Sequence, residues 1–207
     1  HKPKHSGIVR RLVERILRDE DKSQPIRPDD ILHRIFKKCF VIPSAQRGLL
    51  GNADNLAISG DGMVLNTGAS QYGIKECDCH RRGIYTCSCP RRFSDPDANW
   101  GWDSYRERYV FGYANYTFTA ADSPNDLPIF STLAQASRHD SVTHNVALYR
   151  MRTLYPEFNF SQDILDSAHD NYPTYELLTH WGIESFIALN KTNKGNRKYT
   201  ECEIIVD

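Results

Sequence analysis

Helices separate the late β-prone segments of this chain, whereas its early β-prone segments follow one another directly. The expected order is strands at 56–65, 109–119 and 129–136, a helix at 141–155, a strand at 160–166, a helix at 172–181 and a strand at 183–189. Directly joined strands pair antiparallel, and strands joined through helices pair in parallel by right-handed crossovers. The order therefore predicts an α/β fold with a mixed sheet and helices packed on its faces.

The first 50 residues contain two helical patterns. The first places apolar residues on one face, and the second follows Asp29 or Asp30, either of which can cap a helix. We favour packing against the core over a helical lead-in that touches DNA. The chain is divided into a helical segment at 1–50 and a core at 51–207. The apolar positions are Ile8, Val9, Leu12, Val13, Ile16 and Leu17, then Ile31, Leu32, Ile35, Phe36 and Phe40.

The charges of the whole chain are balanced, with 26 Lys and Arg against 26 Asp and Glu. This balance opposes a DNA-binding function weakly, because phosphate contacts usually leave a basic footprint. No apolar run is long enough to span a bilayer, and the N-terminus lacks the apolar segment of a signal peptide. We therefore expect a cytoplasmic protein without a membrane partner, whose thiols stay reduced.

A cysteine-bearing insert at 75–92 contains two Cys-x-Cys pairs, Cys77 with Cys79 and Cys87 with Cys89. Four thiolates can form a tetrahedral structural Zn²⁺ site, and the spacer with Gly83 can form the hairpin that joins the pairs. Two disulfides or four free thiols are the alternatives. We favour zinc, because a reducing compartment disfavours disulfides.

The same insert carries the local basic residues that the whole-chain balance hides. Zinc with four thiolates has a formal charge of about −2, which offsets much of this excess. DNA contact and a solvated, soluble loop are equally compatible with the pattern. The candidate DNA-binding residues are Arg81, Arg82, Arg91 and Arg92.

Two aspartates occupy positions where ligands bind. Asp61 lies in the first strand between Gly60 and Gly62, which leave room for a metal or a phosphate. Asp166 ends the strand at 160–166, and ligands of open α/β sheets bind at such strand ends. If the two strands are neighbours, both carboxylates can share a Mg²⁺ ion. Alternatively, Gly-Asp-Gly is simply a turn.

Six stretches, in their order, resemble the DDE-type transposases of bacterial insertion sequences. They are 58–63 (ISGDGM), 93–104 (FSDPDANWGWDS), 109–113 (YVFGY), 127–128 (LP), 137–141 (SRHDS) and 165–172 (LDSAHDNY). The resemblance runs from about residue 40 to the C-terminus. It implies a ribonuclease-H-like core that cuts DNA and joins its 3′ end to a target, with Mg²⁺ or Mn²⁺ as cofactor. The implied partners are the element ends and the target DNA, with a homodimer assembled on them.

The resemblance makes Asp61 the first acid and Asp166 the second acid of the catalytic triad. Asp170 is the fallback for the second acid, although its place fits a helix cap better. The family's third acid is a Glu on a helix after the last core strand, and no residue here matches it. Glu201 and Glu203 lie in a segment that reads as a strand. We therefore expect the chain to end before that helix and to be inactive by itself.

Two other functions remain open from the sequence. One is a different ribonuclease-H-like nuclease, and the other is a zinc-stabilised DNA-binding module without catalysis. Aromatic residues alternate along 109–119, which favours core packing over base stacking. Four histidines are expected at the surface or as helix caps rather than as ligands. The residues are Tyr109, Phe111, Tyr113, Tyr116 and Phe118, and His139, His144, His169 and His180.

Overall fold

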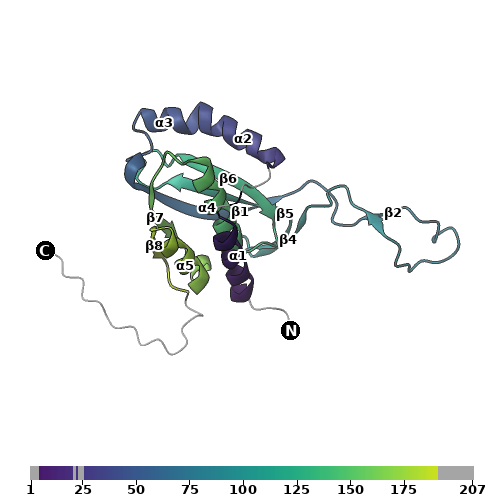
Figure 1. Cartoon of the computed structure of the whole chain (residues 1–207). Helices are drawn as coiled ribbons and strands as arrows, with labels where there is room; N and C mark the ends of the chain where they lie inside the picture. Colours follow the sequence, from purple (N-terminus) through teal and green to yellow (C-terminus); the bar gives the residue numbers. More distant parts are fainter. Residues whose placement is uncertain (1–4, 21, 23–25, 191–207) are drawn as a thin grey trace.

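The computed structural model describes residues 5–20, 22 and 26–190, and its body is a mixed six-stranded sheet with helices packed against it (Figure 1). The strands are β1 (Leu56–Asn66), β4 (Asn99–Asp103), β5 (Arg108–Ala120), β6 (Pro128–Gln135), β7 (Phe160–Leu165) and β8 (Glu184–Ile187). β5 pairs antiparallel with β1, β4 and β6, whereas β7 is parallel to both β1 and β8. The predicted mixed α/β sheet is therefore confirmed.

Strand β4 was not expected from the sequence. It pairs with the first part of β5, and β6 pairs with the remainder, so both strands occupy the same edge of β5. Gly101 of β4 faces the backbone of Ala136, where any Cβ atom would collide. The tight approach of β4 to the end of β6 therefore depends on this glycine.

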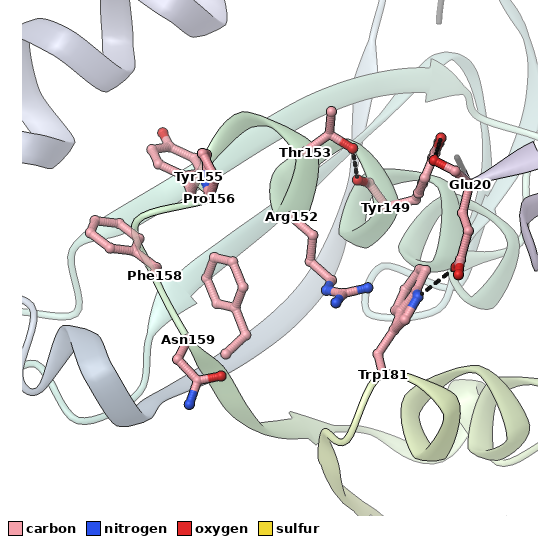
Figure 2. Close-up of a pocket in the computed structure, with 10 residues that line it drawn as sticks. Glu20, Tyr149, Arg152, Thr153, Tyr155, Pro156, Phe158, Asn159 and Trp181 are labelled. Carbon is pink, nitrogen blue, oxygen red and sulfur yellow. Dashed lines mark hydrogen bonds between the residues drawn. The ribbon is translucent and has the colours of Figure 1, made fainter. Parts of the chain in front are cut away.

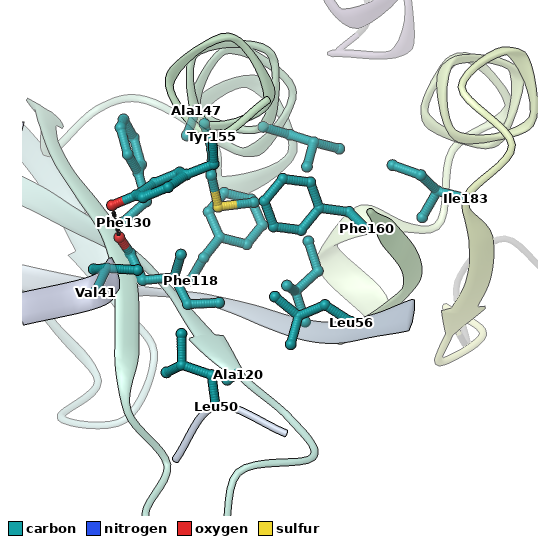
Figure 3. Packing of buried hydrophobic residues seen from close by; sticks show 14 of the residues in the cluster. Val41, Leu50, Leu56, Phe118, Ala120, Phe130, Ala147, Tyr155, Phe160 and Ile183 are labelled. Atoms are coloured by element: carbon teal, nitrogen blue, oxygen red, sulfur yellow. Dashed lines mark hydrogen bonds between the residues drawn. The ribbon is translucent and has the colours of Figure 1, made fainter. Parts of the chain in front are cut away.

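The two crossover helices are α4 (Asp140–Leu154) and α5 (Tyr172–His180). They contact each other, and α4 packs against β5 and β6. The main core lies between α4 and the sheet, as Figure 3 shows for Tyr155, Phe118 and Phe130. Tyr155 donates a hydrogen bond to the carbonyl of Ile129 at 2.8 Å, so its hydroxyl is satisfied inside the core.

The alternation of β5 is regular, but only part of its aromatic set faces the core. Tyr116 and Phe118 are fully buried, whereas Phe111 and Tyr113 are partly exposed and Tyr109 is 70% exposed. The prediction of core packing is thus correct only for the aromatic residues at even-numbered positions, Tyr116 and Phe118. The odd positions point to the other face, because successive strand residues alternate.

Helix α1 (His5–Asp19) packs as its apolar stripe predicts. Val9, Val13 and Ile16 are buried against Leu177 of α5. Val9 is completely inaccessible to solvent, so this helix belongs to the packed body. Its apolar face stabilises the contact by removing hydrocarbon from water.

Helix α2 (Pro28–Phe36) continues through a wide π-helical turn (Lys37–Val41) into α3 (Ile42–Gln46). Here the expectation of apolar packing is largely wrong, because Ile31, Leu32 and Ile35 are more than half exposed. Phe36 packs against the main core, and polar contacts also attach α2, because Arg150 of α4 bonds both Asp29 and Asp30. Asp30 also accepts the backbone N–H of Arg27 at 2.7 Å, so it caps the helix from inside the first turn.

A long excursion between β1 and β4 projects away from the sheet (Figure 1). It contains the short antiparallel pair β2 (Ile74–Lys75) and β3 (Arg91–Arg92), which flanks the cysteine-bearing insert. No helix in the described ranges is long and apolar enough to cross a membrane. The strand expected around Cys202, with Glu201 and Glu203, lies outside the described residues.

Candidate functional site

Asp61 and Asp166 come from adjacent parallel strands. The last registered pair of β1 and β7 is Ser59 with Ile164, and each aspartate lies two residues further along. Both side chains are exposed, and both line one groove at this end of the sheet. The condition for a shared site, neighbouring strands, is therefore met.

A third carboxylate, Asp140, lines the same groove from the first turn of α4. Burial raises the pKa of Asp140 to about 6, and the charges of Asp166 and Asp61 add to the effect. The sequence contained this residue in the SRHDS stretch, but nothing in its local pattern identified it as an acid of the site. Three oxygen-donor side chains in one groove are the ligand type that hard divalent cations prefer.

The two glycines beside Asp61 have a different role from the expected one. Gly60 gives space to the hydroxyl of Tyr116 and the ring of Phe118, and Gly62 gives space to the carboxylate of Asp140. They therefore allow other side chains of the protein to approach β1, rather than opening a path for a ligand. A Cβ atom at Gly60 would lie 2.5 Å from the Tyr116 oxygen.

The side chain of Asp166 is hydrogen-bonded to a buried histidine, His169. Its Oδ1 atom accepts hydrogen bonds from the backbone N–H of Ala168 at 3.0 Å and from Nδ1 of His169 at 2.7 Å. The other ring nitrogen, Nε2, lies 2.9 Å from the hydroxyl of Tyr116. Burial lowers the pKa of His169 and raises the pKa of Tyr116 well above its usual value. Both groups are therefore neutral at pH 7.

A second buried histidine lies beside the first. His144 of α4 places Nε2 at 2.7 Å from Oδ2 of Asp163, and both side chains are fully buried. The rings of His144 and His169 are 5.2 Å apart between centroids. Placing these two histidines at the surface or at helix caps was wrong. The expectation holds for His139, which accepts the N–H of Ser141 at the start of α4, and for His180, which is half-exposed.

Asp170, the fallback for the second acid, is nearly buried and turned to other partners. It accepts hydrogen bonds from the hydroxyl of Tyr175 and the backbone N–H of Asn190. It does not cap α5 either, since Asn171 is the cap and accepts the N–H of Thr174. The short side chain of Asn171 reaches the helix start because its own backbone is extended.

The groove beside the acids has aromatic and basic walls. Trp102 and Tyr109 form an edge-to-face pair across β4 and β5, with both side chains more than half exposed. Arg106 and Arg138 also line the groove, and Arg106 pairs with Asp103 at 3.3 Å. Sequence reasoning missed this wall, because β4 itself was not expected.

The four cysteines of the insert lie close together and can bind a metal such as zinc. All four sulfur atoms are within 4.8 Å of one another, and the thiols are free. The Cys77–Cys87 and Cys79–Cys89 sulfur pairs are both 3.6 Å apart. Sulfur atoms at the corners of a zinc tetrahedron with 2.3 Å bonds are separated by about 3.8 Å, so the donor set fits this ion.

Hydrogen bonds within the cluster shift the pKa values of two of its thiols in opposite directions. The backbone N–H of Cys79 and the thiol of Cys87 lower the pKa of Cys77 to about 7. By contrast, hydrogen bonds with Cys89 and Cys77 raise the pKa of Cys79 to about 12. Metal binding requires thiolates and therefore releases protons from such a cluster.

The arginines of the insert are all exposed, but some already have acidic neighbours. Arg92 pairs with Glu76 at 2.9 Å, and Arg81 lies 3.8 Å from Asp78. Such solvated pairs are weak, so a phosphate can displace the carboxylates. Arg82 contacts the sulfur of Cys79 at 3.7 Å.

Another pocket lies between the end of α4, the start of β7 and the end of α5, on residues unrelated to the acids (Figure 2). Arg152 stacks over the ring of Trp181 at 4.3 Å, and Glu20 accepts the indole N–H at 3.0 Å. These groups satisfy one another and join α1 to α4 and α5. These three side chains therefore hold the helices together, and we assign this pocket no catalytic or binding role.

Comparison with known proteins gives no match to this chain among protein-family models, curated proteins or solved structures.

Proposed function

We propose that this chain carries the ribonuclease-H-like core of a DDE-type DNA transposase, with Asp61 and Asp166 as acids of its active site. The observation that carries the proposal is their equivalent position on adjacent parallel strands lining one groove. Phosphodiester cleavage and strand transfer are the proposed reactions. DNA is the proposed partner, as element end and as target.

The strand order supports this fold. Counting only β1, β5, β6, β7 and β8, the sheet runs third, second, first, fourth, fifth, with the first three strands antiparallel. The fourth and fifth strands are parallel to the first, each after a crossover helix. This is the arrangement expected of a ribonuclease-H-like core, in which acids on the first and fourth strands meet.

The proposed cofactor is a divalent cation such as Mg²⁺ or Mn²⁺, because carboxylate oxygens are the ligands that such cations prefer. Asp61 and Asp166 would hold it, and the nearby carboxylate of Asp140 would raise its affinity when ionised. Such a cation supplies Lewis-acid assistance to the attacking and leaving oxygens of a phosphodiester. Mg²⁺ usually takes one or two carboxylates and completes its shell with water and substrate phosphate.

The walls of the groove suit a nucleic acid. Trp102 and Tyr109 present exposed aromatic faces, on which unpaired bases can stack. Arg106 and Arg138 offer phosphate contacts next to the acids. The four arginines of the insert would add phosphate contacts at a distance from the groove.

The cation site is tested by Mn²⁺ binding, followed by electron paramagnetic resonance in the presence and absence of a DNA duplex. We expect weak binding without DNA and tighter binding with it, because phosphate oxygens complete the shell. Asp61→Asn and Asp166→Asn should each weaken binding at least about tenfold, since even changes outside the ligand shell cost that much.

Asp126→Asn is the matched control. Asp126 is exposed in the turn between β5 and β6, with a positive φ of 47° that asparagine tolerates. It should leave Mn²⁺ binding unchanged. Equal affinity of the wild type and the Asp166→Asn variant would exclude the proposed site.

The cysteine cluster favours a second role, a zinc-stabilised module that binds DNA without catalysis. Its discriminating variant is Arg91→Ala combined with Arg82→Ala, measured by salt-dependent DNA binding. If these arginines carry the affinity while Asp166→Asn changes neither cation nor DNA binding, the module is the better description. A hydrolytic nuclease, the third possibility, would cut DNA but would not join its 3′ end to a target.

A further inference from the structure

We propose that His169 is a positioning residue for Asp166, fixed in one tautomer by the buried hydroxyl of Tyr116. This inference rests on the proposed function, because it assigns Asp166 a role in cation binding. Asp166 directly follows β7 and caps the short 3-10 helix (Ser167–His169) that contains His169, so these two residues meet locally. Tyr116 comes from β5, 53 residues away from His169, and only the folded sheet brings it to the pair.

For a neutral imidazole, the hydrogen-bond chain has one consistent direction. Asp166 Oδ1 already accepts the N–H of Ala168, so it is an acceptor for His169 Nδ1 as well. A neutral ring with its proton on Nδ1 has a bare Nε2, which must accept. Tyr116 is protonated and donates its O–H to that nitrogen at 2.9 Å. The relay therefore runs from Tyr116 to His169 to Asp166.

This relay fixes one carboxylate oxygen and leaves the other available. Both hydrogen bonds end on Oδ1 of Asp166, and within the described residues Oδ2 accepts none. The side chain of Asp166 is 61% exposed, whereas that of His169 is completely buried. The imidazole thus anchors the carboxylate on its protein side, and Oδ2 remains for a ligand in the groove.

The surroundings hold the histidine itself in place. Its ring packs edge-on against those of Tyr116 and His144. The facing titratable groups are His144 with Asp163 from α4 and β7, Tyr116 from β5, and Asp166 itself. Gly60 of β1 is part of the arrangement, because a side chain there would push the Tyr116 hydroxyl away. The glycine next to Asp61 therefore serves the anchoring of Asp166.

Two variants of His169 separate positioning from packing. Asparagine places its amide nitrogen near the position of Nδ1, whereas glutamine places it near Nε2. His169→Asn keeps the donor to Asp166, and His169→Gln keeps the partner of Tyr116 but loses that donor. With the full 207-residue chain, we expect His169→Gln to weaken Mn²⁺ binding about tenfold, as for other residues that orient a ligand. His169→Asn should stay within about threefold of the wild type.

A second measurement reports the tautomer of His169 directly in the wild-type protein. Nitrogen-15 NMR of the histidine rings should show His169 protonated at Nδ1 and bare at Nε2, with the His169→Asn variant assigning the signal. The opposite tautomer overturns the relay, as does Mn²⁺ binding that is equally weak, or equally strong, in both variants. If Asp166→Asn leaves Mn²⁺ binding intact, the proposed cation site itself fails, and the ring signal still decides the relay separately.

Discussion

The carboxylate of Asp140 lies directly over Gly62, where any side chain on β1 would displace it. The first strand and the first crossover helix therefore meet at the acidic groove with only a glycine between them. Burial raises the pKa of Asp140 to about 6, and the charges of Asp166 and Asp61 add to the effect. Like charges in a partly buried place disfavour ionisation.

The contact predicts a specific effect of Gly62→Ala. The new methyl group must push Asp140 or β1 aside, so Mn²⁺ binding should weaken several-fold and unfolding free energy should fall by about 1–3 kcal/mol. Gly68→Ala is the control, because nothing lies within 4 Å of a Cβ atom there and its φ is ordinary. If the two variants have equal unfolding free energies in urea, a close contact between residue 62 and Asp140 is contradicted.

Asp140→Asn should change how stability depends on pH. A carboxyl group whose pKa is raised in the folded state stabilises the fold fully below its unfolded value of 3.8, and this contribution is lost as pH rises through about 6. In the absence of cations, the variant should therefore be more stable than the wild type above pH 6, by roughly 1–2 kcal/mol after allowing for solvent screening.

Below pH 4, Asp140→Asn and the wild type should have the same stability. The helix N-terminus favours the charged form of Asp140 by only about 0.3–1 kcal/mol, so the sign stands. Urea unfolding at a series of pH values measures the difference. A variant that is less stable than the wild type at pH 8 would show that the charge of Asp140 is well compensated.

The cysteine cluster predicts one zinc ion per chain in protein purified without added metal. Elemental analysis measures it, and the Cys77→Ser, Cys87→Ser double variant should contain none. Cys39→Ser, which changes an exposed free thiol outside the insert, should keep the full amount. Zinc retained by the double variant would contradict the assignment, and so would its absence from the wild type.

Removal of zinc should loosen the insert and leave the sheet folded. The β2–β3 arm contains only a two-stranded pair, and several of its large apolar side chains, including Ile74 and Tyr85, are exposed. Such a small unit lacks a core of its own and depends on the metal. Treatment with a chelator should therefore speed proteolysis within residues 70–93 while far-ultraviolet circular dichroism changes little.

Replacing either His144 or Asp163 alone should lower the unfolding free energy strongly. His144→Leu leaves Asp163 without its partner in the core, where its Oδ1 atom already has no hydrogen bond to any of the described residues. We expect a loss of about 3–5 kcal/mol in unfolding free energy. The double variant His144→Leu, Asp163→Leu should lose less than the single variants together, because no polar group is then left unpaired.

His180→Leu serves as the control for this series. Its side chain is 49% exposed and pairs with Glu20 at 3.2 Å, so the expected cost is below about 1 kcal/mol. Strict additivity of the two core changes would count against a direct interaction between His144 and Asp163.

Local patterns were enough to predict most of the order of elements, although not β4, and the places of Asp61 and Asp166 in that order. The alternation of β5, the apolar stripe of α1 and the paired cysteines of the insert each act over a few residues. Hydrophobic periodicity reports the face that a residue occupies within its own element. For that reason, Asp61 in the first strand and Asp166 at a strand end could be placed from the sequence.

Which distant residues meet was decided only by the tertiary structure. Asp140 reaches the groove, and Tyr116 of β5 reaches His169, because the packing of whole elements brings α4, β5 and the turn after β7 together. No local pattern distinguishes a buried histidine from a surface one, since both have the same propensity for their element. The burial of His144 depends on a partner 19 residues away, and such pairing is set by the packing of whole elements rather than by neighbours in the chain.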